Sequence, residues 1–560
     1  MSQSRSREET IRQDVADLHR LGYAQELFRS MGGFSNFAIS FSIISILTGA
    51  VILFDYGLAW AGTAAVLIGW PLVTVFVLCI AASMAEIASA YPTAGGLYYW
   101  ASKMRNKDWG WWTAWFNLIG QFAIVAGINF AAAFFINQTI VSPLTGGGFS
   151  NTTEVIKLGD TLLISGQLLT MAILMAGQLV LNIAGINVVA FLNQVSVWWH
   201  IVFVVLIAAA LFVLGTKDTG TDAGLTLFAI QPQDTLGSWD ITIPPGDNPI
   251  LQFLFGPATS YAPFVAFFFS LLLANWTYTG YDASAHVAEE TVGARVASAW
   301  GIFLSVAVSA VVGFVFLLAL VLHLPDLTPL FGQLDDPALY SQYYFGDNAA
   351  VVYILTQNLG DGLGGIFGGA IAIAMSFCGL SSVASAGRML YAFSRDDGMP
   401  GSGWLKKVSH RYRTPANALT AMVVGAFLLA LVAFLAGGGT AIVIVTAIST
   451  IFLYAAYGIC IYLGATTSEW IQHRTWSLGR FSKPIAWVAI GWVIVLMILF
   501  SFPTSGNISI TFMLAVVVLL AVYYLVSGRS KFQGPRVMGD AETLTEIERE
   551  FAAAAKEVAG

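Results

Sequence analysis

Long apolar stretches dominate this chain of 560 residues. A helix needs about 20 mostly apolar residues to cross the hydrocarbon core of a bilayer, and about twelve such stretches can be counted. Charged residues make up 10% of the chain, whereas a soluble chain carries about 25%. We therefore expect an all-α integral membrane protein. The predicted spans are Phe34–Gly57, Trp60–Ala82, Trp111–Ile136, Leu162–Ile183, Asn187–Gly215, Pro263–Ala288, Ala299–Leu322, Leu363–Phe393, Ala416–Ala436, Ala441–Ala465, Ile485–Phe502 and Ile508–Val526.

Basic residues are distributed unevenly between the loops that connect these spans. Lys and Arg concentrate in the cytoplasmic loops of membrane proteins. If the N-terminus is inside and the number of spans is even, only Lys157 and Lys217 of the 25 Lys and Arg residues fall outside, which leaves 23 inside. We therefore predict a multi-pass protein of the plasma (cytoplasmic) membrane with cytoplasmic N- and C-termini. The outer loops Thr216–Tyr261 and His323–Asn348 are acidic and rich in Gly and Pro, as solvated connections are.

The sixth predicted span is interrupted by polar residues. In Leu271–Glu290, which reads LLLANWTYTGYDASAHVAEE, the pair Thr279-Gly280 and the carboxylate of Asp282 fall in mid-run. A carboxylate at the centre of a membrane helix costs about 2.5–3.5 kcal/mol on insertion scales, so it is usually retained for function and turned away from lipid. A broken helix also offers free N–H and C=O groups to a solute. We therefore predict a solute-binding site at this interruption.

The first predicted span carries a matching pair, Thr48-Gly49, five spans before Thr279-Gly280. The two segments therefore enter the membrane from opposite sides, as in an inverted five-helix repeat whose two broken helices meet at the site. The alternative is that Thr and Gly simply permit close helix packing. The predicted units are a cytoplasmic N-terminal segment 1–32, a five-helix repeat 33–215, an extracellular loop 216–262, a second repeat 263–465, two additional helices 466–527 and a cytoplasmic C-terminal tail 528–560.

Several stretches resemble a known family. Ala85–Tyr98, which reads AEIASAYPTAGGLY, closely resembles the signature that follows the second span in the amino acid–polyamine–organocation permeases. The sixth span resembles the sixth helix of that family, and Gly387–Pro400, GRMLYAFSRDDGMP, looks like the end of its eighth. The motifs occur in the family's order between Phe34 and Ala465. Ser42–Gly49 further resembles the amino acid/choline branch, whose substrates include amino acids, γ-aminobutyrate and choline.

This resemblance implies a proton-driven or exchanging permease with the leucine-transporter fold. That fold is a 5+5 inverted repeat with broken first and sixth helices, and it rocks between outward and inward states. The break in the first helix of the family usually reads Gly-Ser-Gly or Gly-Thr-Gly, and Leu47 replaces the first glycine here. The departure bears on how closely a substrate carboxylate can approach the amides of Thr48 and Gly49.

A small zwitterion in the middle of a membrane needs its two charges met separately. N–H groups at the start of a half-helix suit a carboxylate, whereas helix-end carbonyls and aromatic faces suit an ammonium. Ile46–Gly49 would supply the former and Asn275–Gly280, with the rings of Trp276 and Tyr281, the latter; packing is the alternative for each ring. The predicted substrate-binding residues are Ser45, Ile46, Leu47, Thr48, Gly49, Asn275, Trp276, Thr279, Gly280 and Tyr281.

Ionisable residues inside the spans are candidates for ion coupling. Asp282 matches an acidic residue in some amino acid antiporters of the family, and could be an amine counter-ion, a proton carrier or a structural partner. His200 aligns with a lysine that some proton-coupled members carry in the fifth helix, and histidine titrates near neutral pH; a packing histidine is the alternative. Ser381 and Ser382 could complete the same pocket. His286 is expected at the cytoplasmic interface.

Charged residues also lie at the predicted cytoplasmic ends of helices. If they pair with one another they could form a gate that opens with rocking, and otherwise they are ordinary interfacial charges. The sequence does not indicate which residues pair. The residues are Glu86, Glu289, Glu290, Arg388 and Arg395.

The predicted function is secondary active transport of an amino acid or a γ-aminobutyrate-like small amine, coupled to protons, by alternating access. A choline, polyamine or other organic-cation transporter and an amino acid exchanger are alternatives. The scarcity of pore-facing charge argues against an ion channel. No clustered His/Asp/Glu set and no Gly-x-x-x-x-Gly-Lys loop is present, so we expect no enzyme activity, cofactor, metal or nucleic-acid partner. Cys79, Cys378 and Cys460 lie in apolar runs and predict no disulfide framework.

Overall fold

The computed structural model describes residues 6–159, 161–215, 227–230, 263–325, 349–409, 411–437, 441–501 and 508–559. Within these ranges, eleven helices are long and apolar enough to cross a membrane. The sixth predicted span is present as a series of shorter helices. The prediction of a multi-span all-α membrane protein is confirmed. The predicted outer loops Thr216–Tyr261 and His323–Asn348 lie almost entirely outside the described residues.

The helices follow the predicted order. The first five spans are α2 (Gly33–Ile44) with α3 (Ile46–Ile52) and α4 (Phe54–Ala61), α5 (Trp70–Ala90), α7 (Lys107–Ile136), α9 (Gly166–Ile183) and α10 (Ile186–Leu214). The next five are α12 (Pro263–Ser270) with α13 (Leu272–Thr277) and α14 (Ala283–His286), α15 (Ala294–Val321), α18 (Ala350–Arg395), α20 (Ala416–Gly437) and α21 (Ala441–Thr466). The last two are α22 (Ser482–Ser501) and α23 (Ile508–Tyr523).

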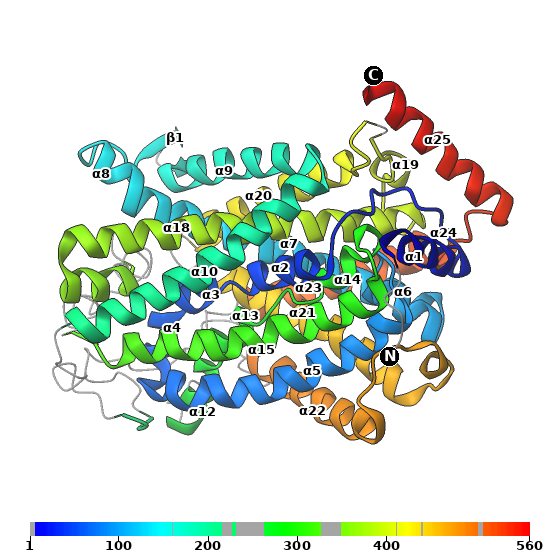
Figure 1. Cartoon of the computed structure of the whole chain (residues 1–560). Coiled ribbons are helices and arrows are strands. Elements are labelled where there is room, and N and C mark those ends of the chain that lie inside the picture. The colour runs from blue at the N-terminus through cyan, green and yellow to red at the C-terminus, as the bar shows by residue number, and fades with distance from the viewer. Residues whose placement is uncertain are drawn as a thin grey trace.

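Shorter elements lie at the two ends of the bundle. In Figure 1, α1, α6, α19, α24 and α25 gather at one end with both chain termini, and α8 and β1 lie at the other. These elements are α1 (Arg7–Leu21), α6 (Leu97–Met104), α8 (Ser142–Leu144), α19 (Ser402–Leu405), α24 (Arg529–Lys531), α25 (Ala541–Ala559), and the antiparallel strands β1 (Glu154–Leu158) and β2 (Thr161–Ser165).

Some of these elements were not predicted. Helix α1 begins with a capping box, in which Ser6 Oγ accepts from Glu9 N and Ser6 N donates to Glu9 Oε2.

Helix α18 begins 13 residues before the predicted eighth span. Its first part is a separate helical segment, which joins the spanning part at Gly360, whose φ is 76°. The two segments fold back closely, since a Cβ at Gly364 would lie 2.7 Å from Thr356 Cα.

Amide side chains join neighbouring spans in the middle of the bundle. Gln178 of α9 donates to Ser376 O of α18 (3.3 Å), and Asn182 donates to Leu380 O (3.2 Å). Asn129 of α7 packs against the same part of α18, since a Cβ at Gly379 would lie 2.4 Å from Asn129 Oδ1. Polar groups and small residues of this kind allow membrane helices to pack closely. They hold α7, α9 and α18 together beside the two broken spans.

Candidate functional site

The first span breaks at Ser45. Helix α2 ends at Ile44, Ser45 adopts left-handed backbone angles (φ 33°, ψ 88°), and α3 begins at Ile46. A serine in this region is strained unless its surroundings hold it. Ser45 Oγ lies 2.5 Å from Thr48 Oγ1 and 2.7 Å from His200 Nε2. These two contacts fix the break.

Two of the four predicted amides at this break are free. The N–H groups of Thr48 and Gly49 donate to Ser45 O at 2.8 and 2.9 Å, so both residues belong to the first turn of α3. In the described part of the chain, no backbone acceptor pairs with the N–H of Ile46 or Leu47. The N–H groups available to an anion are therefore those of Ile46 and Leu47, the first two residues of the predicted segment Ile46–Gly49.

The sixth span breaks where the sequence predicts. Helix α13 ends at Thr277, Gly280 adopts a φ of 87°, and α14 begins at Ala283. Among the described residues, no hydrogen bond is donated to the carbonyl oxygens of Thr277, Tyr278 or Thr279. Buried carbonyls are nearly always paired in proteins. Three consecutive unpaired carbonyls at a helix end are suited to a cation.

The two breaks face each other. A Cβ at Gly49 would lie 2.7 Å from Thr277 Cα, and a Cβ at Gly280 would lie 2.2 Å from Ile43 Cγ2. Helix α3 contacts α13, and α2 contacts α14, so the second half of each span meets the first half of the other. Ser40 Oγ of α2 also donates to Tyr281 O (2.9 Å). This antiparallel pairing is the geometry expected of inverted repeats.

A small cavity separates the breaks. Its volume is about 10 Å³, the space of roughly one water molecule. The helices around it must therefore move to admit a larger solute. The cavity is lined by Ile43, Ile44, Thr48, Gly49, Ile124, Ile128, Trp276, Thr277 and Thr279.

The predicted binding residues divide into two groups around this cavity. Four of the ten, Thr48, Gly49, Trp276 and Thr279, line it, and the other six do not: Ser45, Ile46, Leu47, Asn275, Gly280 and Tyr281. Trp276 is held in place by a hydrogen bond from its Nε1 to Ser449 Oγ of α21 (2.9 Å). Four apolar residues that line the cavity were not predicted, because isoleucines in a span carry no signal that separates them from core residues; they are Ile43, Ile44, Ile124 and Ile128.

Asn275 and Tyr281 lie outside the cavity wall. Asn275 turns toward the last spans, where its Oδ1 accepts from Trp492 Nε1 (3.3 Å) and its carbonyl accepts from Tyr454 OH (3.1 Å). The Tyr281 ring packs against the Tyr457 ring with centroids 5.1 Å apart. The Tyr281 hydroxyl is buried and has no hydrogen-bond partner among the described residues.

His200 touches the first break directly. Its ring is fully buried, Nδ1 lies 2.7 Å from Ser196 O, and Nε2 lies 2.7 Å from Ser45 Oγ. A neutral histidine satisfies both contacts, because Nδ1–H donates to the carbonyl while Nε2 accepts from the serine hydroxyl. The predicted closeness of His200 to the site is present.

Ser381 and Ser382 do not bond to His200. Ser381 Oγ donates to Asn193 Oδ1 of α10, and Ser382 Oγ donates to Cys378 O of its own helix at 2.9 Å. The contact from α18 to the first break is made by Cys378, whose Sγ donates to Ile43 O (3.2 Å). Spacing along the chain could not show which side chain of this helix turns toward α2.

Asp282 and His286 form a buried pair beyond the sixth break. Both side chains are fully buried, and His286 Nε2 lies 3.1 Å from Asp282 Oδ2. Asn117 Nδ2 and Tyr457 OH donate to the same carboxylate at 3.0 and 2.8 Å. His286, which was expected at the cytoplasmic interface, is fully buried inside the protein, and one helical turn brings its side chain to Asp282.

The charges at the helix ends that the sequence predicts to be the inner, cytoplasmic ones pair across the bundle. Arg388 donates to both oxygens of Glu290 at 2.7 and 3.3 Å, and Arg395 donates to both oxygens of Glu289 at 3.1 and 3.0 Å. These four residues, the inner charge cluster, join the end of the sixth span to the end of α18. Both pairs are buried and bidentate, which is the geometry that favours a strong ion pair.

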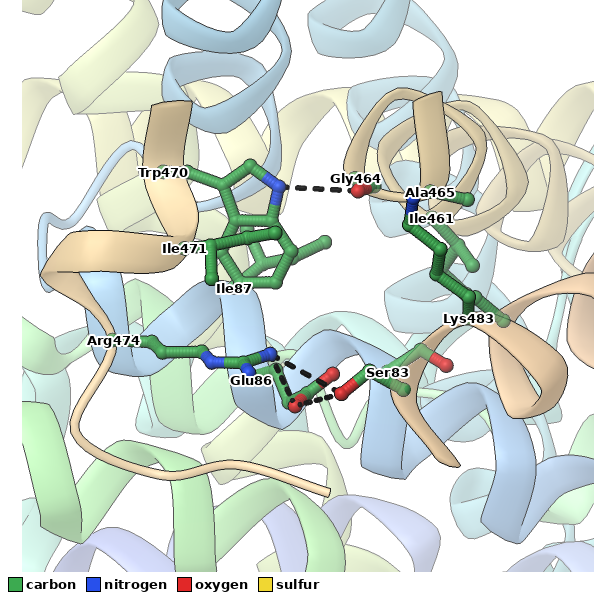
Figure 2. A pocket seen from close by; sticks show the side chains of 12 residues that line it. Ser83, Glu86, Ile87, Ile461, Gly464, Ala465, Trp470, Ile471, Arg474 and Lys483 are labelled. Atoms are coloured by element: carbon green, nitrogen blue, oxygen red, sulfur yellow. Dashed lines mark hydrogen bonds and ion pairs between the residues drawn. The ribbon is translucent and has the colours of Figure 1, made fainter. Parts of the chain in front are cut away.

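Glu86 does not belong to the inner charge cluster. It accepts from Arg474 Nη1 (2.8 Å), Leu478 N (2.7 Å) and Ser482 Oγ (2.7 Å). Figure 2 shows this pair beside a larger, mostly apolar cavity of about 30 Å³ between α5, α21 and α22. The Glu86 carboxylate beside this larger cavity is already paired, and neither break contributes to the lining of the cavity. The smaller cavity between the breaks is therefore the candidate solute site.

The N-terminal segment covers the inner charge cluster. Gln25 Nε2 donates to Glu289 O (2.8 Å), and Met31 N donates to Glu290 O (2.9 Å). Glu26 accepts a hydrogen bond from Tyr391 OH of α18. Burial raises the pKa of the Glu26 carboxyl above its ordinary value, although Arg395 opposes the shift. Protonation of Glu26 therefore favours attachment of this segment.

Among the described residues, no three His, Cys, Asp or Glu side chains lie close enough together to hold a metal ion.

Comparisons with known proteins show the family of this chain. The family model described as amino acid permease matches residues 31–523. The amino-acid permease BAT1 of Arabidopsis thaliana is 36% identical over 535 residues, which cover 92% of this chain and 95% of that protein. The GABA-specific permease of Saccharomyces cerevisiae is 27% identical and covers 92% and 85% of the two chains. A putative polyamine transporter of Candida albicans is 26% identical and covers 94% and 89%.

Proposed function

The chain belongs to the amino acid permease family, and we propose that it carries an amino acid or a γ-aminobutyrate-like small amine across the membrane by proton-coupled alternating access. A multi-pass membrane transporter, and not an enzyme, is what this family membership means. We propose, beyond this, the identity of the substrate, the coupling ion and the membrane in which the protein lies. Relatives named for amino acids, γ-aminobutyrate and polyamines support a small solute that carries an amino group.

The unpaired backbone groups at the two facing breaks carry this proposal. The N–H groups of Ile46 and Leu47 suit a carboxylate, and the carbonyls of Thr277, Tyr278 and Thr279 suit an ammonium. Free donors at one break and free acceptors at the facing break match a zwitterion better than a quaternary amine, which needs an aromatic cage and no anion site. Trp276 adds one aromatic face on the cation side.

Alternating access follows from the closed cavity. A space of about one water cannot hold an amino acid, so the substrate enters only after the helices around the cavity separate on one side. On the inner side, the inner charge cluster and the N-terminal segment must release. The excess of Lys and Arg in the inner loops supports a plasma-membrane orientation with both termini in the cytoplasm.

Substrate identity and transport can be tested in two steps. A thermal-shift screen of the purified protein against amino acids, γ-aminobutyrate, choline and polyamines identifies ligands, because a ligand that binds only the folded protein raises its apparent stability. Counterflow in proteoliposomes then tests transport. We expect saturable counterflow of an amino acid or γ-aminobutyrate. Conductance without saturation would indicate a channel, and shifts with choline or polyamines alone would reassign the substrate.

A further inference from the structure

Both ring nitrogens of His286 face oxygen atoms. Nδ1 lies 3.1 Å from Ala94 O, and Nε2 lies 3.1 Å from Asp282 Oδ2. A carbonyl oxygen only accepts, so Nδ1 carries a hydrogen. A neutral imidazole has no second N–H to give to the carboxylate. The pair therefore holds one proton more than a neutral histidine beside an ionised aspartate.

The other partners of Asp282 favour its ionised form. Asn117 Nδ2 and Gln121 Nε2 donate to Oδ2 at 3.0 and 3.3 Å, and Tyr457 OH donates to Oδ1 at 2.8 Å. A carboxylate that accepts several hydrogen bonds is stabilised as the anion. The extra proton then resides on His286 as an imidazolium, which balances the charge of Asp282 in a fully buried place.

We propose that Asp282 and His286 together form the site that binds the coupled proton, an inference that rests on the proton-coupled function proposed above. One proton binds His286 Nε2 from one side of the membrane and leaves to the other side, and no other bond changes. His200 stays neutral in this account, because its two contacts, Ser196 O and Ser45 Oγ, require only one ring N–H.

The groups around the Asp282–His286 pair are neutral or already paired with another charge, so the pair itself is the place where a proton can be exchanged. Helix α7 contributes only the amides of Asn117 and Gln121, and α21 contributes Tyr457 and Cys460. Tyr281 precedes Asp282, and α2 presents Asn36 and Ser40 to Ser284. On α18, the charged residues that face this segment are Arg388 and Arg395, which are paired with Glu290 and Glu289.

The position of the pair explains how its proton can govern both ends of the site. Toward the break, Tyr457 OH bonds Asp282 and also accepts from Gly280 N at 3.4 Å. Toward the inner side, Ala94 accepts from His286 and donates its own N–H to Glu289 Oε1 at 3.0 Å. Loss of the proton leaves a ring-nitrogen lone pair facing a carboxylate, and the resulting repulsion acts on the break and on the inner charge cluster together.

The test separates proton movement from substrate exchange. Wild type and His286→Gln are reconstituted with the substrate found by the screen, and two readouts are taken: counterflow at equal pH, and the pH of the vesicle interior when substrate is added. We expect His286→Gln to keep counterflow and to lose substrate-induced proton movement. The matched control is His323→Gln, a buried histidine whose Nδ1 bonds Ala319 O of its own helix, and it should keep both.

Two results decide against the proposal. Proton movement retained in His286→Gln would overturn the assignment, and its loss in His200→Gln would then move the site to His200. Counterflow in the wild type without any proton movement would overturn the coupled proton but leave the transporter. Absence of counterflow in the wild type with every ligand would contradict the proposed function instead.

A second measurement needs neither transport nor a variant. Nitrogen NMR of wild-type protein in vesicles, labelled with ¹⁵N-histidine and ¹³C-aspartate, identifies His286 by its contact with an aspartate carboxyl. We expect both of its ring nitrogens to carry a hydrogen while the Asp282 carboxyl is ionised, as the contacts with Ala94 O and Asp282 Oδ2 require. A single protonated nitrogen beside an ionised Asp282 would overturn the proposal.

Discussion

Gly49 of α3 lies against Thr277 of α13 so closely that a Cβ at position 49 would stand 2.7 Å from the Thr277 Cα. This contact joins the second half of the first span to the first half of the sixth, beside the cavity that both breaks line. It places an absolute limit on the size of residue 49. The two half-helices must separate or slide at this point if the cavity is to open.

Substitution of Gly49 should therefore damage transport. In Gly49→Ala the added methyl group meets backbone as well as the Thr277 side chain, and overpacking of this kind costs about 1–3 kcal/mol. We expect counterflow to fall about tenfold or more, with a lower melting temperature. The matched control is Gly177→Ala on α9, where an added Cβ has no neighbour within 4 Å, and counterflow equal in the two variants would contradict the packing account.

The ring of Trp276 should contribute to substrate binding. A cation over an aromatic face is worth about 0.5–2 kcal/mol, so Trp276→Ala should weaken apparent affinity by about 2–30-fold and reduce the ligand-induced thermal shift. Trp276→Phe keeps a ring but loses the hydrogen bond to Ser449. Its apparent affinity should therefore lie between those of the wild type and Trp276→Ala. Trp198→Phe, on a ring that is 62% exposed, serves as the control. An unchanged affinity in Trp276→Ala would remove the ring from the site.

The inner charge cluster should obey the rule for buried ion pairs. Removal of one partner leaves an unpaired buried charge and costs about 3–5 kcal/mol, whereas removal of both costs much less. We therefore expect Arg395→Gln to melt at a lower temperature than the double variant Glu289→Gln/Arg395→Gln. The equivalent single variant of an exposed pair, Lys406→Gln, should be near wild type. If the double variant were the least stable of the three, pairing would not be the main role of these residues.

Attachment of the N-terminal segment should weaken as pH rises. Because burial raises the folded-state pKa of Glu26, its favourable contribution is complete below the ordinary value of 4.5 and is lost as pH rises through the raised value. Asp14, whose pKa burial also raises, acts with the same sign. Hydrogen exchange of residues 22–32, corrected for its intrinsic pH dependence, should show protection that falls from pH 4.5 upward.

In Glu26→Gln this pH dependence should become shallower, with only the Asp14 part left. Glu8→Gln, at an exposed position of α1, should follow the wild type. Equal slopes in wild type and Glu26→Gln would mean that another group controls the attachment.

Much of the architecture could be predicted because lipid imposes strong rules. A run of about twenty apolar residues predicts a span, and a Thr-Gly pair with a carboxylate in mid-span predicts a break in it. The break at Gly280 was therefore predicted at the correct residue. The first break was placed three residues too late, because a serine at left-handed angles depends on His200, 155 residues away. The separate helical segment before Gly360 was missed, since its residues continue an apolar pattern.

The side chains of the site were harder to predict than the breaks. Asn275 and Trp276 are neighbours in sequence, yet Trp276 lines the cavity and Asn275 turns toward Trp492. Which way each points is set by α21 and α22, and no local pattern reports that contact. His286 shows the same limit. The role proposed for it depends on its contacts with both Asp282 and Ala94, and only Asp282 lies one helical turn away in the sequence.

Protection of a single cysteine by substrate tests the facing breaks most directly. Cys79, Cys378 and Cys460 are replaced by Ala, and Thr279→Cys is added, because the Thr279 hydroxyl bonds only Trp276 O of its own segment. Thr466→Cys, at an exposed position, is the control. In variants that retain counterflow, we predict that the transported substrate slows labelling of position 279 and leaves position 466 unchanged. Labelling of position 279 at the same rate with and without saturating substrate would contradict a binding site between the two breaks.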